Sequence, residues 1–243
     1  MPSARRAFLT ANWRHLVMLN YEIAPELLEP LVPAGTILDS FGGRTLFSVV
    51  GFRFLETRVL GLPIPFHRNF DEVNLRFYVR RELPNGEVRR GVVFVRELVP
   101  RIAIALVARA VYNEPYRRVA MKSVSPDGRT EDPGRIEYAW RTSGHWQHVG
   151  ATISGEPALA RAGSEAEFVT EHFWGYTRQR DGGTVEYEVR HPPWRVWDAT
   201  SPTFDADVIG VYGSTFASAF AAAPRSAFVA EGSPVTVFRP ARI

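Results

Sequence analysis

Arg14 is the first residue whose type and setting suggest chemistry. It stands among apolar and aromatic residues near the start of a predicted strand. A guanidinium fork binds carboxylates through two parallel hydrogen bonds, so Arg14 is a candidate for holding a substrate carboxylate or enolate. The alternative is a surface arginine that covers Trp13 or Tyr21.

Glu72 begins an apolar strand and is the leading candidate for proton transfer. A carboxylate moves protons efficiently near neutral pH only when its surroundings raise its pKa. The alternative is an ordinary salt bridge to Arg68 or Arg76.

Tyr116, His172, Tyr176 and His191 are candidates for supporting roles. The Tyr116 phenol either packs beside Pro115 or enters a pocket as a hydrogen-bond donor or weak acid. The other three are polar groups among aromatic residues, and they are candidate substrate-binding residues. A single histidine in such surroundings is more often a satisfied core residue than a catalyst.

Arg109 lies on a predicted buried helix at 101–112, which has apolar residues on nearly every face. A buried arginine needs a partner, and Glu97 or Glu114 is the expected one. Arg109 is therefore either half of a structural ion pair or a further substrate-binding cation.

The local motifs of common enzyme classes are missing. Lys122, the single lysine, follows no glycine-rich loop, so there is no phosphate-binding P-loop. No dinucleotide-binding G-x-G-x-x-G pattern joins a strand to a helix, and no G-x-S-x-G nucleophile elbow occurs. His145 and His148 fall on opposite faces of a predicted strand, which disfavours a shared metal ion. The sequence predicts neither a cofactor nor a metal site.

The composition indicates one globular unit. The chain has 243 residues, of which 45% are hydrophobic and 12% aromatic, and 1–243 is expected to be a single domain. The absence of cysteine fits a reducing compartment, so we expect a cytoplasmic protein. The longest apolar run, 102–108, is about a third of a membrane span. Arginines alternate with acidic residues, so neither nucleic-acid nor membrane binding is expected.

Most of the elements that position these side chains are predicted to be strands. Segments 73–83 and 88–99 flank an Asn-Gly turn and predict a hairpin. Other segments rich in β-branched and aromatic residues are 45–59, 135–141, 145–153, 184–190 and 234–239.

Fewer segments favour helix. They are 25–31, 101–112, 164–179 with a Ser164-x-x-Glu167 capping box, and the alanine-rich 205–223, which Gly210 and Gly213 interrupt. The sequence therefore predicts an α+β fold, mostly antiparallel β, in which a few helices cover a large sheet.

Three segments, in order along the chain, carry a further signal. They are N-W-R-H-L at 12–16, F-D-E-V-N-L at 70–75, and the stretch 103–121 with its N-E-P-Y-R-R. Together they resemble the YqjF-like family of uncharacterised proteins in the acetoacetate decarboxylase-like superfamily, over nearly the full length. The resemblance implies a closed or nearly closed β-barrel whose active site takes Arg14 and Glu72 from the first two segments.

The third segment departs from the decarboxylases. They carry Gly-aromatic-Pro-Lys-Lys, and with Pro115 matched to that proline the Schiff-base lysine position falls on Tyr116 and its neighbour on Arg117. A phenol forms no imine with a ketone, and a guanidinium stays protonated. Lys122 would have to swing back into the pocket. The resemblance therefore implies a protein that is not a Schiff-base acetoacetate decarboxylase.

The leading hypothesis is a small-molecule site in the barrel mouth. Arg14 would hold an anionic or carbonyl group, Glu72 and Tyr116 would manage a proton, and Arg109 would lie close behind. A lyase, hydratase or isomerase step beside a carbonyl would need no cofactor. The rivals are a non-catalytic ligand-binding protein and a structural or assembly protein with a filled barrel. We also expect a homo-oligomer, because superfamily members commonly associate and aromatic and arginine side chains are favoured at interfaces.

Overall fold

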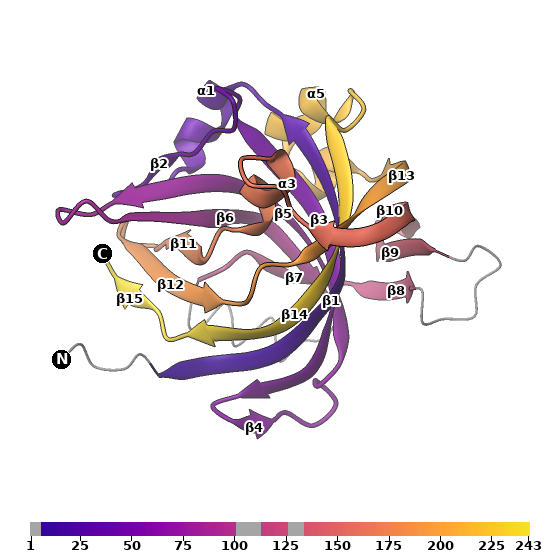
Figure 1. The fold of residues 1–243 in the computed structure, drawn as a ribbon, viewed down its shortest axis with the longest axis horizontal. Helices are drawn as coiled ribbons and strands as arrows, with labels where there is room; N and C mark the ends of the chain where they lie inside the picture. The colour runs from indigo at the N-terminus through magenta and orange to yellow at the C-terminus, as the bar shows by residue number, and fades with distance from the viewer. Residues whose placement is uncertain (1–5, 101–112, 126–133) are drawn as a thin grey trace.

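Strands make up most of the protein, as the sequence predicts (Figure 1). The computed structural model describes residues 6–100, 113–125 and 134–243, so the predicted helix at 101–112, with Arg109, lies outside the described residues. The strands are β1 (Ala7–Glu22), β2 (Ile37–Leu38), β3 (Leu46–Val59), β4 (Leu62–Pro63), β5 (Phe70–Glu82), β6 (Val88–Val99), β7 (Tyr116–Arg118), β8 (Ala120–Val124), β9 (Arg135–Thr142), β10 (His145–Leu159), β11 (Trp174–Arg178), β12 (Thr184–Arg190), β13 (Arg195–Asp205), β14 (Ser226–Phe238) and β15 (Ala241–Arg242).

Seven strands close into a ring. Their order is β12-β11-β6-β5-β3-β1-β14, and β14 returns to β12 through the pairs Val189↔Val237 and Arg190↔Thr236. Most neighbours are antiparallel, while β11 and β7 each pair with β6 in parallel. The ring is not a regular barrel. The prediction of a mostly antiparallel, closed or nearly closed sheet is confirmed.

A second layer covers the outer face of the ring. From β14 the sheet continues through β13, β10, β9 and β8. Buried side chains of this layer, among them Tyr138 and Trp140, pack against Phe47 of β3 and Phe77 of β5. We call this cluster the outer core. Alternate side chains of each strand point to the same side, so the buried apolar residues of these strands gather in this one cluster.

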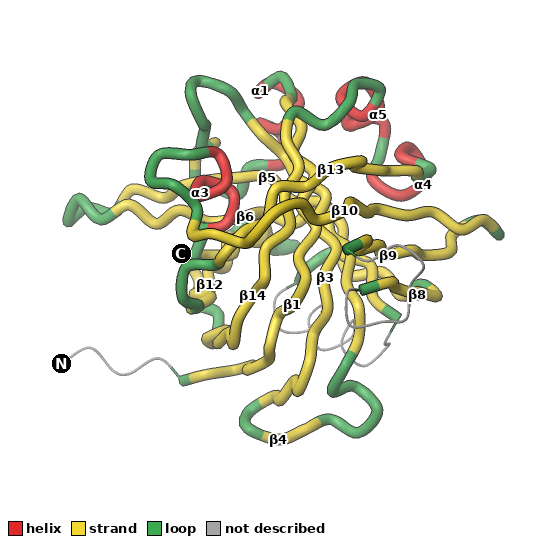
Figure 2. The backbone as a smooth tube through the Cα atoms, turned by 45° about the vertical axis from the view of Figure 1, so that its right-hand side comes forward, coloured by secondary structure: helices red, strands yellow, loops and turns green. Residues whose placement is uncertain are grey.

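The helices are shorter than the sequence predicts. They are α1 (Pro25–Leu28), α3 (Glu165–Thr170), α4 (Val208–Tyr212) and α5 (Ala217–Phe220), with 3₁₀ turns η1 (Glu29–Leu31) and η2 (Ser214–Phe216). Figure 2 shows α1 and α5 at the end of the molecule opposite β4. Among the described residues, no helix is long and apolar enough to cross a membrane.

The helix prediction at 164–179 was wrong in extent. Ser164 does cap α3, accepting a hydrogen bond from the Glu167 amide at 3.2 Å. The helix nevertheless ends at Thr170, because residues 174–178 pair with β12 and β6 as β11. Tertiary strand pairing thus overrides the helix pattern. In 205–223 the chain breaks at Gly213, one of the two predicted interruptions, where φ is a left-handed 97°, whereas Gly210 lies within α4.

Candidate active site

The interior of the ring holds a cavity of about 110 Å³. On this measure one water needs roughly 10–15 Å³, so the cavity has room for several waters or a small organic molecule. All seven ring strands contribute to its wall. Much of that wall is aromatic, with side chains in edge-to-face and stacked contact, namely Trp13, Phe52, Phe54, Phe70 and Trp194.

Strand β5 supplies the polar end of the cavity. Glu72, Asn74 and Arg76 are two residues apart, so they share the inner face of the strand, and all three line the cavity. Glu72 is 2% exposed. Its Oε1 accepts a hydrogen bond from Asn74 Nδ2 at 3.0 Å, and its Oε2 accepts one from the Tyr116 hydroxyl at 3.3 Å. The structure therefore brings two of the predicted site residues, Glu72 and Tyr116, into contact.

A β-bulge turns a second carboxyl into the cavity. The β5–β6 register jumps from Leu75↔Arg96 to Arg76↔Phe94, which leaves Val95 as an extra residue. Such a bulge re-aims the side chains beyond it. Phe94 and Glu97 consequently both line the cavity, although strict alternation would place them on opposite faces. Glu97 Oε2 is buried and has no hydrogen-bond partner in the described part of the chain.

The chain at β7 adds a third carboxyl. β7 runs parallel to the end of β6, with Tyr116 in register with Glu97. Glu114, two residues before Tyr116, is buried and lines the cavity, where it accepts a short hydrogen bond from the Tyr187 hydroxyl. Glu72, Glu97 and Glu114 thus surround the Tyr116 phenol, and we call these four residues the carboxyl cluster.

Burial sets the protonation of the carboxyl cluster. It raises the pKa of Glu72 to about 7, although the hydrogen bonds from Asn74 and Tyr116 and the charge of Arg76 oppose it. Burial, with repulsion from Glu72, raises the pKa of Glu114 to about 8. Burial, with repulsion from Glu114 and Glu72, raises the pKa of Glu97 well above its usual range. Near neutral pH the cluster is therefore largely uncharged, and Glu72 is the member poised to exchange a proton.

Burial also keeps the phenol neutral. It raises the pKa of Tyr116 well above its usual value, and the three neighbouring carboxyls add to the shift. Tyr116 is thus a hydrogen-bond donor rather than a phenolate, in line with one of the two roles that the sequence left open.

Arg76 is the only cation among the described residues that line the cavity. It is 8% exposed, and its Nη2 donates to the Val169 carbonyl at the end of α3 at 2.9 Å. Its Nε is buried and has no hydrogen-bond partner in the described ranges. The described residues contain no ion pair between Glu72 and either Arg76 or Arg68. Arg76 therefore keeps hydrogen-bonding capacity for an anion.

The two candidate histidines line the cavity, but Tyr176 does not. Burial lowers the pKa of His172 to about 4 and that of His191 to about 4, so both imidazoles are neutral at neutral pH. Tyr176 belongs to the outer core and donates its hydroxyl hydrogen to the Arg89 carbonyl at 3.3 Å.

Arg14 lies away from Glu72 and Tyr116. Its neighbour Trp13 faces the cavity, and His15 has a left-handed φ of 54° where β1 gains a residue relative to β3. Arg14 therefore lines a separate, more open hollow, and its Nη1 donates to the Trp13 carbonyl at 3.1 Å. The structure does not bring the three proposed catalytic residues together. Arg76, not Arg14, supplies the cation beside Glu72.

Lys122 also lies away from the cavity. It is on β8, in the second layer, with its Nζ 4.5 Å from the centre of the Trp146 ring. Lys122 is the only lysine in the sequence, and it is not among the described residues that line the cavity.

Several polar residues of this cavity were not predicted from the sequence. Asn74 and Arg76 had a readable signal, since Glu72, Asn74 and Arg76 alternate with Val73 and Leu75. Glu97 and Glu114 were considered only as partners of Arg109. Their inward positions depend on the bulge and on the pairing of β7, which no local pattern encodes.

Comparisons with known proteins agree with this fold. The model of the DUF2071 family, described as "Uncharacterized conserved protein", matches residues 10–234. YqjF of Bacillus subtilis (strain 168), itself described as uncharacterized, is 25% identical over 208 residues, which span 84% of this chain and 81% of YqjF.

Three solved structures share the architecture. The enduracididine biosynthesis enzyme MppR in complex with pyruvate superimposes with a TM-score of 0.69 over 99% of this chain and 91% of its own. Acetoacetate decarboxylase from Legionella pneumophila superimposes with a TM-score of 0.68 over 100% of this chain and 92% of its own. An acetoacetate decarboxylase-like enzyme from Sphingomonas wittichii RW1 has a TM-score of 0.65 over 98% of this chain and 94% of its own. Each is 13% identical to this chain, so the likeness establishes the fold alone.

Proposed function

This chain belongs to the DUF2071 family, and we propose that its ring cavity binds a small oxo acid and catalyses proton exchange between the keto and enol forms of that acid. Two structural neighbours point to this class of compound. MppR has been solved with pyruvate, and another neighbour is an acetoacetate decarboxylase, and both named compounds are small oxo acids. The proposed reaction is an isomerase step beside a carbonyl.

The observation that carries the proposal is the carboxyl cluster. Glu72 and Glu97 are 2% and 1% exposed, and within the described residues neither makes an ion pair. Burying carboxyl groups that form no ion pair is unfavourable for folding, and it pushes them towards the protonated form. Titratable groups perturbed in this way, gathered on the wall of a cavity, are typical of sites that transfer protons.

Arg76 is the proposed anchor for the carboxylate of the acid. Its guanidinium is a strong hydrogen-bond donor, and its Nε has no partner among the described residues. The carboxyl cluster is largely uncharged near neutral pH, so it does not repel a bound anion. The aromatic wall formed by Trp13, Phe54 and Phe70 then suits an apolar substituent at the far end of the ligand.

The proposed step moves one proton at each end of a carbon–carbon bond. Ionised Glu72 takes a proton from the carbon next to the ketone, and the electron pair of that C–H bond forms the enol double bond. The ketone π electrons pass to oxygen, which takes a proton from a protonated acid of the cluster, Glu97. As Glu72 becomes protonated, the single hydroxyl hydrogen of Tyr116 turns from Glu72 to the ketone oxygen and stabilises the negative charge that develops there. The reverse step returns a solvent-derived proton to carbon.

Deuterium exchange tests this proposal. Phenylpyruvate offers a carboxylate for Arg76, a ketone for the cluster and a ring for the aromatic wall. In deuterium oxide we expect the protein to speed the loss of its methylene protons, as followed by proton NMR. Glu72→Gln keeps the size of the side chain but removes the base, so the rate should fall by roughly 10²–10⁴-fold.

Asp71→Asn is the matched control. Asp71 precedes Glu72 on β5, points to the other face and pairs with Arg53 at 3.1 Å. It should leave the exchange rate unchanged. If wild-type protein binds phenylpyruvate but does not accelerate exchange, the cavity is a binding site without catalysis, and the proposed reaction is wrong.

A further inference from the structure

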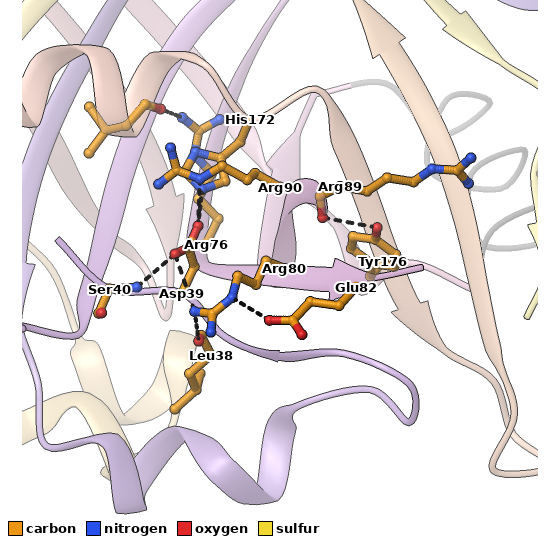
Figure 3. A network of polar contacts seen from close by, with 11 residues as sticks. Leu38, Asp39, Ser40, Arg76, Arg80, Glu82, Arg89, Arg90, His172 and Tyr176 are labelled. Carbon is orange, nitrogen blue, oxygen red and sulfur yellow. Dashed lines mark hydrogen bonds and ion pairs between the residues drawn. The ribbon is translucent and has the colours of Figure 1, made fainter. Parts of the chain in front are cut away.

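Asp39 is buried behind the cavity-lining residue His172, at the centre of a polar network (Figure 3). Its Oδ2 accepts hydrogen bonds from Arg90 Nε at 2.7 Å and from His172 Nε2 at 3.3 Å. Its Oδ1 accepts one from the Ser40 amide at 2.9 Å and lies 3.7 Å from Arg80 Nη1. Two arginines and an amide thus hold Asp39 as an ionised carboxylate.

This network fixes the proton on His172. A carboxylate only accepts hydrogen bonds, so the imidazole nitrogen facing Asp39 must carry the hydrogen. Burial would raise the pKa of Asp39, but the hydrogen bonds from His172 and Arg90 outweigh it and lower that pKa to about 2. Since burial lowers the pKa of His172 to about 4, the ring carries one hydrogen near neutral pH, which sits on Nε2 and leaves a lone pair on Nδ1.

The described residues leave the Nδ1 atom of this cavity-lining histidine without a partner. His172 is 7% exposed and lines the cavity, and its ring is held against Tyr78 and Phe168 at 4.7 and 4.9 Å between centroids. Its Nδ1 is buried with no hydrogen-bond partner in the described ranges. A buried acceptor without a donor is costly, so a bound ligand that supplies a donor gains affinity here.

We infer that Asp39 is a positioning residue that makes His172 Nδ1 a hydrogen-bond acceptor for a hydroxyl group on the cavity ligand. The charge of Arg76 acts on His172, which places the acceptor near the proposed carboxylate anchor. A ligand that binds both Arg76 and His172 Nδ1 carries a hydroxyl group beside its carboxylate. A 2-hydroxy acid and the enol form of a 2-oxo acid both have this arrangement. This inference rests on the proposed binding of an acid at Arg76 but not on proton transfer by Glu72.

The first arm of the test uses the free protein. Long-range proton–nitrogen NMR spectra of nitrogen-15-labelled protein distinguish the two neutral tautomers of histidine. At neutral pH we expect the Nε2–H form for His172. An Nδ1–H form or a charged ring would overturn the inference, whatever the ligand.

The second arm compares two ligands that differ by one hydroxyl. By calorimetry, 3-phenyllactate should bind roughly 5- to 100-fold more tightly than 3-phenylpropanoate, because only the first supplies a donor to Nδ1. Asp39→Asn should reduce this preference to about twofold or less. The amide nitrogen of Asn can donate to Nε2, so the hydrogen of His172 can move to Nδ1, which then no longer accepts a hydrogen bond from the ligand. The exposed Asp181→Asn is the matched control and should keep the preference.

The outcomes separate the two proposals. Equal affinity for both ligands in wild-type protein, or a preference that survives Asp39→Asn, would overturn the role of the Asp39–His172 pair. Absence of binding by either ligand would overturn the ligand class as well. A hydroxyl preference without deuterium exchange of phenylpyruvate would support the pair and contradict only the proposed reaction.

Discussion

The two faces of β5 bury side chains of opposite kinds. Its outer face places Val73, Leu75 and Phe77 in the outer core, where the second layer packs over them. Its inner face places Glu72 and Arg76 in a cavity where several buried polar atoms have no hydrogen-bond partner among the described residues. The outer core is organised to stabilise the fold, whereas the ring interior keeps polar groups that a stable core would avoid. Stability and chemistry are thus divided between two sides of one strand.

The largest expected effect is on the outer face. Phe77 is fully buried, so Phe77→Ala removes a large apolar side chain from a packed region and should destabilise the protein by about 3–5 kcal/mol. Glu72→Gln, five residues earlier on the inner face, should cause no comparable destabilisation at neutral pH, because it removes a buried group whose ionisation disfavours the folded state. Urea unfolding at neutral pH measures both. Similar losses for the two variants would remove the distinction between the faces.

A binding defect without a stability defect is expected at Arg76. Arg76→Met keeps the apolar stem but removes the proposed anchor, so affinity for 3-phenyllactate should fall at least about 30-fold. Calorimetry measures the affinity, and Arg190→Met, at an exposed arginine on β12, is the control. An unchanged affinity would show that a different residue holds the acid.

The ring interior should also dominate the pH dependence of stability. The pKa values of Glu72 and Glu114, raised to about 7 and about 8, mean that the folded state keeps protons that the unfolded chain releases. Their stabilising contribution is complete below the unfolded-state pKa and is lost as pH rises through the folded-state pKa. Between its unfolded-state and folded-state pKa, each group lowers the free energy of unfolding by roughly 1.4 kcal/mol per pH unit.

Glu72→Gln combined with Glu114→Gln should therefore flatten the profile. The unfolding free energy would be measured in urea from about pH 5 to about pH 7.5. Buried neutral His172 and His191 act in the opposite direction at the acidic end, so the difference between variant and wild type is the informative quantity. Parallel profiles would mean that these carboxyls titrate normally.

The smallest effect is expected at Lys122, in the second layer. Lys122→Met removes one exposed cation–π contact, worth about 0.5–1 kcal/mol, and should leave ligand binding unchanged. Borohydride treatment in the presence of acetoacetate should leave no reduced adduct on the wild-type protein. A mass increase mapped to Lys122 would contradict its position outside the cavity.

Much of the fold, but only part of the cavity, could be predicted from the sequence. The hairpin of β5 and β6 follows from alternation and an Asn-Gly turn, and the place of Glu72 follows from the family resemblance. Alternation along β5 also indicates that Asn74 and Arg76 share the face of Glu72. Alternation does not predict the faces of Glu97 and Arg14 correctly, because bulges at Val95 in β6 and His15 in β1 change which side the following side chains point to.

Long-range pairing explains the remaining differences. Asp39 meets His172 only because β2 lies against β5 while the end of α3 lies over the cavity, and no spacing in the sequence indicates this. The helix pattern at 164–179 was overridden by strand pairing in the same way. Local patterns predict an element and its faces, but contacts between distant elements decide which polar residues share a cavity.

The titration of Glu72 tests the central claim most directly. Carbon-13 NMR of the glutamate side-chain carboxyls, with Glu72→Gln used to assign the resonance, follows the protonation of this one group. We expect a midpoint near pH 7, because burial in the ring outweighs the hydrogen bonds and the charge of Arg76. A midpoint near the ordinary value of about 4.5 would contradict the account, since Glu72 would then be a solvated carboxylate with no special capacity to exchange protons.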